Sequence, residues 1–327
     1  MFLSFIIPIY NCEQYIKQNL DIILSSQLSS DDYEVILVDD GSSDGSAGIC
    51  KQYADQNRNI RYIYQRNQGP ATARNTGLDN AKGDYVWFVD ADDRINSELL
   101  PRLKNIVDTE EKVDLVSFGY VSEYPDGDQL VTMVEQPCTL NGLQFLQMPH
   151  HGSYLWNNIY RREAIGSVRL LDGVSHIEDT CFNQQVIIKF DRVIVLPDIG
   201  YYYNRCNVNS ISNNRFLRDR VKANNDSLLV YQTLYQEMMR STNPEHQNFY
   251  RKSLHFSVNA HLYTIMRFDN VRTLKKYVSR YRAMGVYPLA PTGNRKGDLF
   301  RLVANCPWLM CLMMRIAIFA KKIIGNK

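Results

Sequence analysis

The seven cysteines of this 327-residue chain form no CxxC pair and lack the spacing of zinc ligands or of a disulfide framework. We therefore expect reduced thiols in a reducing compartment. The N-terminus also lacks the pattern of a signal peptide, because no basic residue precedes the first apolar run and Pro8 interrupts it early. Together these absences predict a cytoplasmic location.

Other absences narrow the possible functions. The chain has no internal repeat, no low-complexity tract, no GxGxxG fingerprint for dinucleotides and no P-loop. Its formal net charge of +2 is too small for nucleic-acid binding over the whole surface. With 45% hydrophobic and 22% charged residues, the composition is that of an ordinary globular protein. The length suits about two domains.

Positive charge is concentrated at the C-terminus. Residues 295–327 contain seven basic residues and one acid, a net charge of +6, which leaves −4 for the rest of the chain. The most hydrophobic stretch, residues 302–320, lies in this tail and is interrupted by Arg315. A central arginine costs a membrane span about 2.5–3.5 kcal/mol on insertion, so a helix lying on an anionic membrane surface suits this composition better. A helix packed on the preceding helices is the alternative.

The first hundred residues alternate between strand and helix patterns, which implies an α/β sheet with right-handed crossovers. Continuous apolar runs predict buried strands, and spaced apolar positions between them predict helices. The predicted strands are 3–9, 35–38, 60–64 and 85–89, and the predicted helices are 12–26, 46–56, 70–81 and about 97–108.

The pattern changes after residue 110, and we expect four segments in all. Residues 1–110 and 111–210 are the two halves of one α/β domain, 211–290 form a helical domain, and 291–327 form the tail. Within the second half and the helical domain, the patterns predict a hairpin over 115–134, irregular helix over 141–165, a helix over 178–190, strands at 192–196 and 199–204, and helices over 216–283.

Aromatic and acidic side chains follow three of the predicted strands. Tyr10 and Asn11 follow the first, Asp40 the second, and the Asp90-Ala91-Asp92 triplet the fourth. Open α/β sheets bind ligands beyond the carboxyl ends of their strands. The triplet suits a hard divalent cation that bridges to phosphates, and Asp40 can accept the ring N–H of a base stacked on Tyr10. Solvated turns with aspartate helix caps fit the same residues.

Arg74 lies in the helix that follows the loop Asn67–Gly69, one strand before the acidic triplet. A guanidinium at this position can meet a diphosphate or the edge of a base. An arginine on the surface of a helix is the alternative.

Five segments, in register and in this order, resemble family 2 glycosyltransferases of the GT-A fold. The resemblance is dense over residues 1–100, looser over 101–205 and absent beyond. It implies a Rossmann-like mixed sheet flanked by helices, here with an all-helical C-terminal extension. The segments are Phe5–Asn11, Val38–Asp44, Asn67–Gly77, Gly83–Tyr85 and Phe88–Asp93.

The resemblance assigns a role to each residue of the donor site. The nucleobase lies against Pro8 and Tyr10, and Asp40 reads its edge. Arg74 assists nucleotide binding, Asp90 reaches the ribose, and Asp92 ligates a divalent cation, Mg or Mn, on the diphosphate. The complete donor set is Pro8, Tyr10, Asn11, Asp40, Arg74, Asp90 and Ala91.

The resemblance also places a catalytic base at the start of the helix that begins near residue 178. Asp179 aligns best, and Glu178 is the second candidate. A helix N-terminus lowers the pKa of a carboxyl group, so we expect Asp179 to be ionised at neutral pH. An N-terminal helix cap is the alternative role.

The segment Trp156–Glu163 resembles the acceptor side of capsule and lipopolysaccharide transferases. It implies acceptor contacts from Trp156 and Asn157, with Trp156 stacked on a sugar ring. A core tryptophan fits equally well. The chain lacks the QxxRW motif of processive synthases, which favours the transfer of a single sugar.

The sequence thus predicts an inverting, metal-dependent glycosyltransferase of bacterial surface-polysaccharide assembly. Its donor is a nucleotide sugar, with UDP expected, and its acceptor a saccharide, expected to be lipid-linked at the cytoplasmic face of the membrane. Transfer to a polyprenyl phosphate is one alternative, and a non-catalytic nucleotide-sugar-binding scaffold is another. No nucleic acid is expected as a partner.

Overall fold

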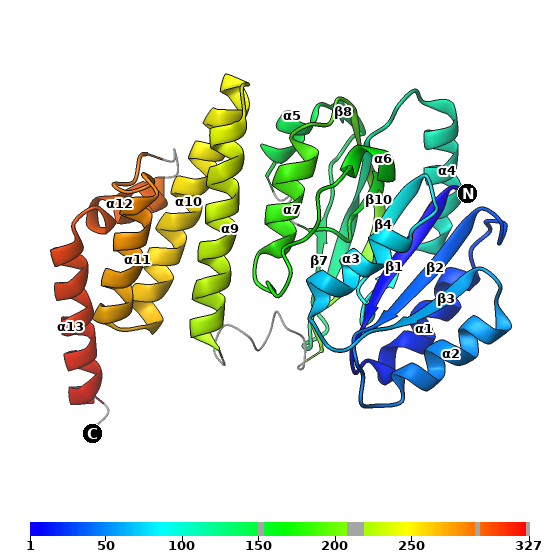
Figure 1. Cartoon of the computed structure of the whole chain (residues 1–327), viewed down its shortest axis with the longest axis horizontal. Helices are drawn as coiled ribbons and strands as arrows, with labels where there is room; N and C mark the ends of the chain where they lie inside the picture. Colours follow the sequence, from blue (N-terminus) through cyan, green and yellow to red (C-terminus); the bar gives the residue numbers. More distant parts are fainter. Residues whose placement is uncertain (150–153, 208–218, 292–294, 325–327) are drawn as a thin grey trace. The chain divides into compact units, whose positions relative to one another are not determined.

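The computed structural model describes residues 1–149, 154–207, 219–291 and 295–324 (Figure 1). The chain divides into two compact units, Met1–Ala223 and Asn224–Lys327. The predicted boundary at residues 210 and 211 lies outside the described residues, and so does the 292–294 part of the predicted tail.

The first unit is built on a ten-stranded mixed sheet with the order β3-β2-β1-β4-β9-β6-β10-β5, in which β7 pairs with β6 and β8 pairs with β10. The strands are β1 Leu3–Ile9, β2 Tyr33–Asp39, β3 Ile60–Tyr64, β4 Tyr85–Phe88, β5 Arg94–Ile95, β6 Leu115–Glu123, β7 Gln129–Thr132, β8 Cys138–Leu140, β9 Asn158–Arg161 and β10 Val193–Asn204.

Helices cover both faces of this sheet (Figure 1). The predicted helices of the first hundred residues are present, each within a few residues of its expected ends. The helices are α1 Glu13–Leu24, α2 Ser46–Gln56, α3 Pro70–Asn80, a 3-10 turn Ser97–Leu99 leading into α4 Leu100–Thr109, α5 Gly142–Leu146, α6 Arg162–Ile165 and α7 Glu178–Ile187.

The parallel half of the sheet fixes where the motifs meet. β1 pairs in parallel with β2 and β4, and Ile9 lies opposite Asp39 at the end of the ladder. All seven residues of β2 are buried, as a strand covered on both faces requires. The residues that follow β1, β2 and β4 therefore emerge at one edge of the sheet, as the sequence predicted.

The segment 141–165 differs from its prediction. Instead of irregular helix it contains two short helices and the strand β9, which lies antiparallel between β4 and β6. β9 has only four residues, with polar ends around the buried pair Ile159 and Tyr160, so no strand period is visible in the sequence. The predicted strands at 192–196 and 199–204 are one strand, β10, with register shifts on both sides of Ile199.

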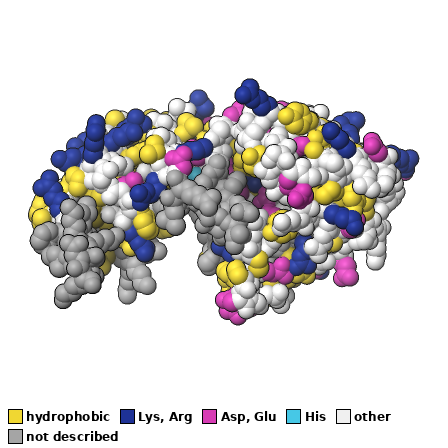
Figure 2. Space-filling model, turned by 90° about the horizontal axis from the view of Figure 1, so that it is seen from below, with side chains coloured by type: hydrophobic (Ala, Val, Ile, Leu, Met, Phe, Trp, Pro, Cys, Tyr) yellow, Lys and Arg dark blue, Asp and Glu magenta, His cyan; other side chains and the backbone are white. Residues whose placement is uncertain are grey.

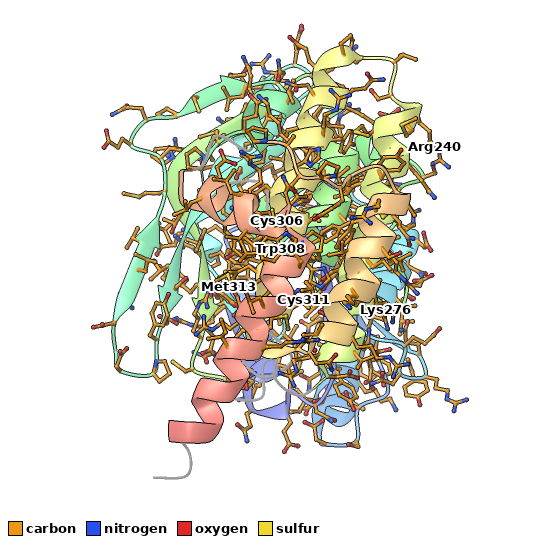
Figure 3. All side chains as sticks on the ribbon, turned by 90° about the vertical axis from the view of Figure 1, so that its left-hand side faces the viewer. Arg240, Lys276, Cys306, Trp308, Cys311 and Met313 are labelled. Atoms are coloured by element: carbon orange, nitrogen blue, oxygen red, sulfur yellow. The ribbon has the colours of Figure 1, made fainter. Side chains whose placement is uncertain are left out.

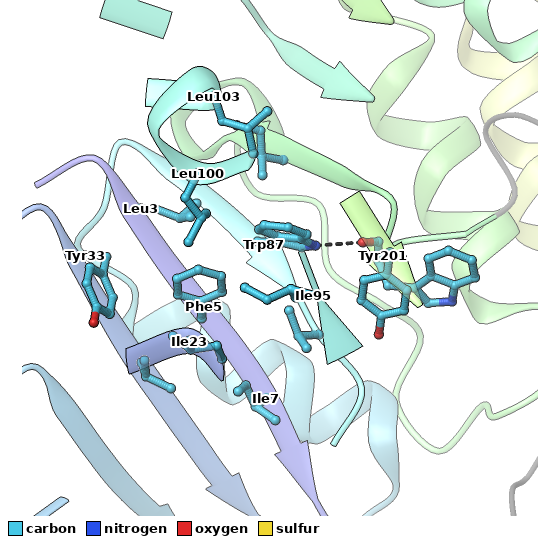
Figure 4. Close-up of a cluster of buried hydrophobic side chains, with 14 of the residues drawn as sticks. Leu3, Phe5, Ile7, Ile23, Tyr33, Trp87, Ile95, Leu100, Leu103 and Tyr201 are labelled. Carbon is cyan, nitrogen blue, oxygen red and sulfur yellow. Dashed lines mark hydrogen bonds between the residues drawn. The ribbon is translucent and has the colours of Figure 1, made fainter. Parts of the chain in front are cut away.

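An aromatic core lies against the face of the sheet that bears α1 and α4 (Figure 4). The ring of Trp87 on β4 lies 5.6 Å from that of Phe5 and 4.9 Å from that of Phe118, measured between centroids. Its indole Nε1 donates a hydrogen bond of 2.6 Å to the carbonyl oxygen of Trp156. This packing fixes the position of β4, whose end carries the acidic turn.

The second unit is helical, as predicted. Its helices are α9 Arg220–Arg240, α10 Pro244–Phe268, α11 Val271–Ala283, α12 Arg295–Ala304 and α13 Pro307–Ile324. Asn243 caps α10 and Asn270 caps α11, each through its side-chain oxygen.

The C-terminal tail packs on this unit. Asn305 donates to the carbonyl oxygen of Leu289 and accepts from its N–H, while Tyr287 donates to the carbonyl oxygen of Ala304. Ala304 and Met310 are buried. Among the described residues, no single helix has the length and apolar character of a membrane span. Two helical segments separated by a bend, Asp298–Ala304 and Pro307–Ile316, together have the length and apolar composition of a span.

Candidate active site

The end of β1 presents an aromatic side chain at the sheet edge. Tyr10 follows Ile9 directly and is 55% exposed, so its ring is open to a ligand. Asn11 adopts φ 50, a left-handed conformation that Asn tolerates, and its Oδ1 accepts from Ser43 N at 2.8 Å. Pro8 lies within β1, opposite Val38. The nucleobase contacts predicted for these residues stay predictions.

Asp40 is buried at the end of β2 and holds the loop that leads into α3. Its Oδ1 accepts from Gln65 Nε2 and from Gln68 N, and its Oδ2 accepts from Gly69 N, each at 2.8 Å. Three of about four lone-pair positions of the carboxylate are therefore used. The remaining position on Oδ2 is the one that a base N–H would need, so base reading by Asp40 stays a prediction.

The acidic turn after β4 is held by hydrogen bonds from distant segments. Asn19 Nδ2 on α1 donates to the carbonyl oxygens of Asp90 and Asp93, at 3.2 and 2.9 Å. Tyr201 on β10 accepts from Asp90 N and donates to Asp93 Oδ2. Burial first, then the charges of Asp92 and Asp90, raise the pKa of Asp93 well above its usual value. Asp93 is thus a buried anchor of the turn.

Asp92 is suited to a cation. Burial, followed by the charge of Asp90, raises the pKa of its carboxyl group, so a positive charge bound beside it would favour the ionised form. Among the described residues, no cluster of three or more potential ligand side chains occurs. A cation of the magnesium type binds through one or two carboxylates together with substrate phosphates. Asp92, with Asp90 and Ala91 beside it, is the segment available to hold such a cation.

Arg74 joins the two sides of the site. Its Nη2 lies 2.7 Å from Asp90 Oδ1, and its Nη1 lies 3.4 Å from Glu178 Oε1 and 3.7 Å from Asp179 Oδ1. Burial disfavours the charged guanidinium, but the charges of the three carboxylates outweigh it and raise the pKa of Arg74. The alternative of a surface arginine is wrong, since the side chain is 8% exposed.

Asp179 is not a helix cap. The cap position of α7 is occupied by Ile177, whose φ of 56 is a strained value for a β-branched residue. Asp179 is the second residue of the helix, and its Oδ1 is buried without a hydrogen bond from any part of the chain that the structure describes. A buried oxygen without a hydrogen bond costs stability, and here its charge is offset by Arg74 Nη1 at 3.7 Å.

The predicted ionisation of Asp179 is wrong. Burial, followed by the charge of Glu178, raises its pKa to about 8, against the lowering effect of Arg74. Removal from water and a neighbouring acid outweigh the helix N-terminus here. Below that pH the group is largely neutral, and above it Asp179 is a stronger base than an ordinary aspartate.

The prediction that Trp156 stacks on a sugar is wrong. Its ring is 3% exposed and lies between Tyr154 and Tyr201, at centroid distances of 4.6 and 4.5 Å and within 18° of parallel. Both faces are covered, so Trp156 is a core residue. Asn157 is buried as well, with its carbonyl oxygen accepting from Phe118 N, so its side chain does not reach a surface acceptor in this structure.

One contact to the metal-binding candidate was not predicted from the sequence. Asn207 Nδ2, just after β10, donates to Asp92 Oδ2 at 2.7 Å. Asn204, the last residue of β10, holds the same turn with two groups, because its Nδ2 donates to the carbonyl oxygen of Asp92 and its N donates to Asp93 Oδ1. The signal available was the position of both asparagines at the end of a predicted strand.

Comparison with known proteins identifies the family of this site. The family model described as glycosyl transferase family 2 matches residues 4–169, which is half of the chain. The chain belongs to this family. The match includes the strand ends that carry Tyr10, Asp40 and Asp92 and the helix that carries Arg74, and it ends before α7.

Individual relatives are similar over the same part. The glycosyltransferase EpsJ of Bacillus subtilis is 34% identical over 64% of this chain and 62% of its own length. The poly(ribitol-phosphate) beta-glucosyltransferase of Bacillus spizizenii is 41% identical over 62% of this chain and 32% of its own. This chain therefore spans less than two thirds of the length of these relatives.

A solved structure extends the similarity of fold to nearly the whole chain. Residues 1–349 of Staphylococcus aureus TarS, in complex with UDP-GlcNAc, match with a TM-score of 0.74 and 19% identity, covering 99% of this chain and 92% of that one. The predicted GT-A-like mixed sheet with a helical C-terminal region is confirmed.

Proposed function

We propose that this protein transfers one sugar, with inversion, from a UDP-sugar to a lipid-linked saccharide in bacterial surface-polysaccharide biosynthesis. One observation carries the proposal: a single buried arginine, Arg74, joins Asp90 on the donor side to Asp179, a carboxylate with an unpaired oxygen and a raised pKa. Groups with such a perturbed pKa at a sheet edge are typical of acid–base catalysis.

Each residue of the proposed site has a role that follows from its position. Tyr10 stacks on the base, and Asp40 accepts its N–H while it holds the Gln65–Gly69 loop. Asp90 hydrogen-bonds the ribose and is fixed by Arg74. Asp179 removes the proton from the acceptor hydroxyl as that hydroxyl attacks the anomeric carbon opposite the diphosphate.

The leaving diphosphate lies beside Asp90 and Asp92. Bound at Asp92, a divalent cation, Mg or Mn, supplies positive charge to the diphosphate oxygens and lowers the cost of their release. Asn207 orients the Asp92 carboxylate through Oδ2. A mannosyltransferase of this fold, PcManGT from Pyrobaculum calidifontis, is solved with GDP-Man and Mn2+ (TM-score 0.52), which supports a cation here.

The UDP donor and the acceptor class are supported by relatives. TarS is solved with UDP-GlcNAc, and two relatives in Bacillus subtilis are the minor teichoic acid biosynthesis proteins GgaA and GgaB. We further propose that the protein acts in the cytoplasm, peripherally attached to the cytoplasmic face of the membrane, where a lipid-linked acceptor would lie.

The donor is tested by thermal unfolding with a panel of UDP-, GDP-, CDP- and TDP-sugars in the presence of manganese. A ligand at about 100 times its Kd raises the unfolding free energy by about 2.7 kcal/mol. We expect stabilisation by one or more UDP-sugars, followed by UDP release when a lipid-linked saccharide is added. Stabilisation by another nucleotide class alone would contradict the donor assignment, and inversion is read from the product anomer by NMR.

The role of Asp92 is tested by measuring UDP affinity with and without manganese. In the wild type we expect manganese to tighten binding by at least about tenfold, since the cation joins diphosphate to carboxylate. Asp92→Ala removes that gain, whereas Asp55→Ala, an exposed aspartate on α2, keeps it. Equal affinities in all four wild-type and Asp92→Ala measurements would show that no cation acts here.

A further inference from the structure

The outer surface of helix α11 is strongly basic. This thirteen-residue helix contains five basic residues and no acid. Its apolar and aromatic side chains Leu274, Tyr277, Val278 and Tyr281 are buried, which turns the cations outward. The five exposed cations are Arg272, Lys275, Lys276, Arg280 and Arg282.

The outer surface of α13 is apolar instead. Trp308, Leu312 and Ile316 recur every fourth residue and are 69%, 46% and 59% exposed, with Met313 beside them. Residues four apart lie on one side of a helix, so these side chains form one stripe. Met310 and Met314 are buried on the inward side. Arg315 is the exposed cation within the stripe.

These two helices pack against each other within the second unit. Figure 3 looks onto α13 with Trp308 and Met313, and α11 with Lys276 lies beside it. In Figure 2 the helical unit presents Lys and Arg side chains together with hydrophobic ones along its outer edge. We call the combined surface, Arg272 to Arg282 of α11 and Trp308 to Ile316 of α13, the α11/α13 surface.

We propose that the α11/α13 surface docks on an anionic lipid bilayer, with the α11 cations on the headgroups and the α13 stripe at the acyl boundary. A helix with an apolar stripe beside clustered cations lies in the plane of a membrane interface. Each Lys or Arg near an anionic leaflet strengthens binding by roughly fivefold. The sequence adds further cations at Lys321, Lys322 and Lys327.

This inference deepens the proposed membrane location, because it assigns binding to named side chains and adds α11 to the C-terminal tail. Removal of the tail would not be a suitable test of this inference. Ala304 and Met310 are buried and Asn305 bonds to Leu289, so truncation would expose the core. Point substitutions on the exposed faces leave that packing in place.

Trp308 provides a built-in probe. The chain has three tryptophans, and Trp87 and Trp156 are 0% and 3% exposed, so Trp308 is the one that can meet a bilayer. With the full chain and vesicles of phosphatidylcholine and phosphatidylglycerol, we expect its emission to shift to shorter wavelength and to be quenched by brominated acyl chains. Trp308→Phe should remove the shift but leave most of the sedimentation with vesicles.

Two variants test the two parts of the surface. Lys275→Gln, Lys276→Gln and Arg280→Gln together should weaken binding to anionic vesicles by roughly a hundredfold. The control removes three exposed lysines of the first unit, Lys17, Lys82 and Lys189, and should retain binding.

The apolar stripe is tested by Leu312→Gln with Ile316→Gln, which should weaken sedimentation and reduce the Trp308 shift. Met239→Gln on α9, which is also exposed, should do neither.

The proposal is overturned if the control triple loses as much affinity as the α11 triple, or if vesicles of phosphatidylcholine alone bind equally well. A Trp308 shift that depends on protein concentration without vesicles would identify a second copy of the chain as the occupant. Because these measurements need no turnover, loss of membrane binding and loss of sugar transfer are separate results.

Discussion

Two parts of the first unit hold their carboxylates in opposite ways. One is the sheet edge proposed to bind the sugar donor, called the donor edge, and the other is the start of α7, which carries the proposed catalytic base and is called the base region. At the donor edge, Asp40 accepts three hydrogen bonds at 2.8 Å. In the base region, Asp179 Oδ1 has no hydrogen-bond donor in the described chain, and its pKa is raised to about 8. A carboxylate that accepts several hydrogen bonds is fixed in place and suits recognition. A carboxylate with an oxygen that accepts no hydrogen bond keeps both a lone pair and its basicity, which proton transfer requires.

The largest expected effect is on turnover. Asp179→Asn keeps the shape of the side chain but removes the proton acceptor, so kcat should fall by roughly 10²–10⁴-fold. Donor Kd should change little, because the proposed nucleotide contacts are made by Tyr10, Asp40 and Asp90. Steady-state kinetics with a binding titration of UDP separate these quantities. If Asp179→Asn is active and Glu178→Gln is inactive, Glu178 is the base.

The next effect is on donor recognition. Asp40→Asn loses an acceptor that holds the Gln65–Gly69 loop and that we propose for the N3–H of uracil. We expect UDP to bind roughly tenfold to a hundredfold more weakly and the free energy of unfolding to fall by about 1–3 kcal/mol. CDP, whose cytosine has no proton at N3, should lose less affinity than UDP.

A control for this recognition lies in the neighbouring loop. Asp44 accepts from Glu13 N and Ser46 N and does not contact the proposed base pocket. Asp44→Asn should therefore affect UDP and CDP equally. Equal losses for both nucleotides in Asp40→Asn as well would remove Asp40 from base reading.

Asp179→Asn should lower turnover but raise the free energy of unfolding at high pH. A carboxyl group whose pKa is about 8 in the folded state and near 4 when unfolded favours folding at low pH. That contribution is lost as the pH rises from about 4 to about 8. Asp179→Asn cannot ionise, so at pH 8 it should be more stable than the wild type by up to about 5 kcal/mol. Denaturant unfolding at pH 8 and pH 4.5 measures the difference, which should vanish at the lower pH.

The smallest effect concerns Glu178, whose charge is the second cause of the raised pKa. In the wild type, kcat/KM should rise with pH and level off above about 8, because only ionised Asp179 accepts a proton. Glu178→Gln removes a neighbouring negative charge, so we expect the midpoint of this profile to move to lower pH by roughly one unit or less. A midpoint that moves upward would mean that Glu178 does not act through its charge.

The donor edge was predictable because its information is local. Tyr10 and Asp40 follow directly on strands made of continuous apolar runs, and Asp92 lies in the turn after a third. The parallel register then brings these strand ends together. Tyr10, Asp40 and Asp92 could therefore be placed from the sequence, with the resemblance supplying their roles.

The features of the site that the sequence did not predict depend on contacts between distant segments. The pKa of Asp179 is set by burial, which its place at the start of a predicted helix does not reveal. Trp156 is enclosed by Tyr154 and Tyr201, and Tyr201 lies on a strand far along the chain. Asn207 meets Asp92 only because β10 closes beside the acidic turn. None of these follows from a pattern within one segment.

The position of β9 has a consequence for synthesis of the chain. β9 lies between β4 and β6 and is made after both. While a ribosome is still adding residues, β1 to β4 can assemble as a parallel sheet, but β4 and the Leu115–Ser117 part of β6 lack the neighbour that β9 provides. Unpaired edges with buried apolar side chains favour aggregation of nascent chains. We therefore expect chains stalled before Asn158 to need a chaperone, and chains stalled well past Asn204, the end of β10, to need none.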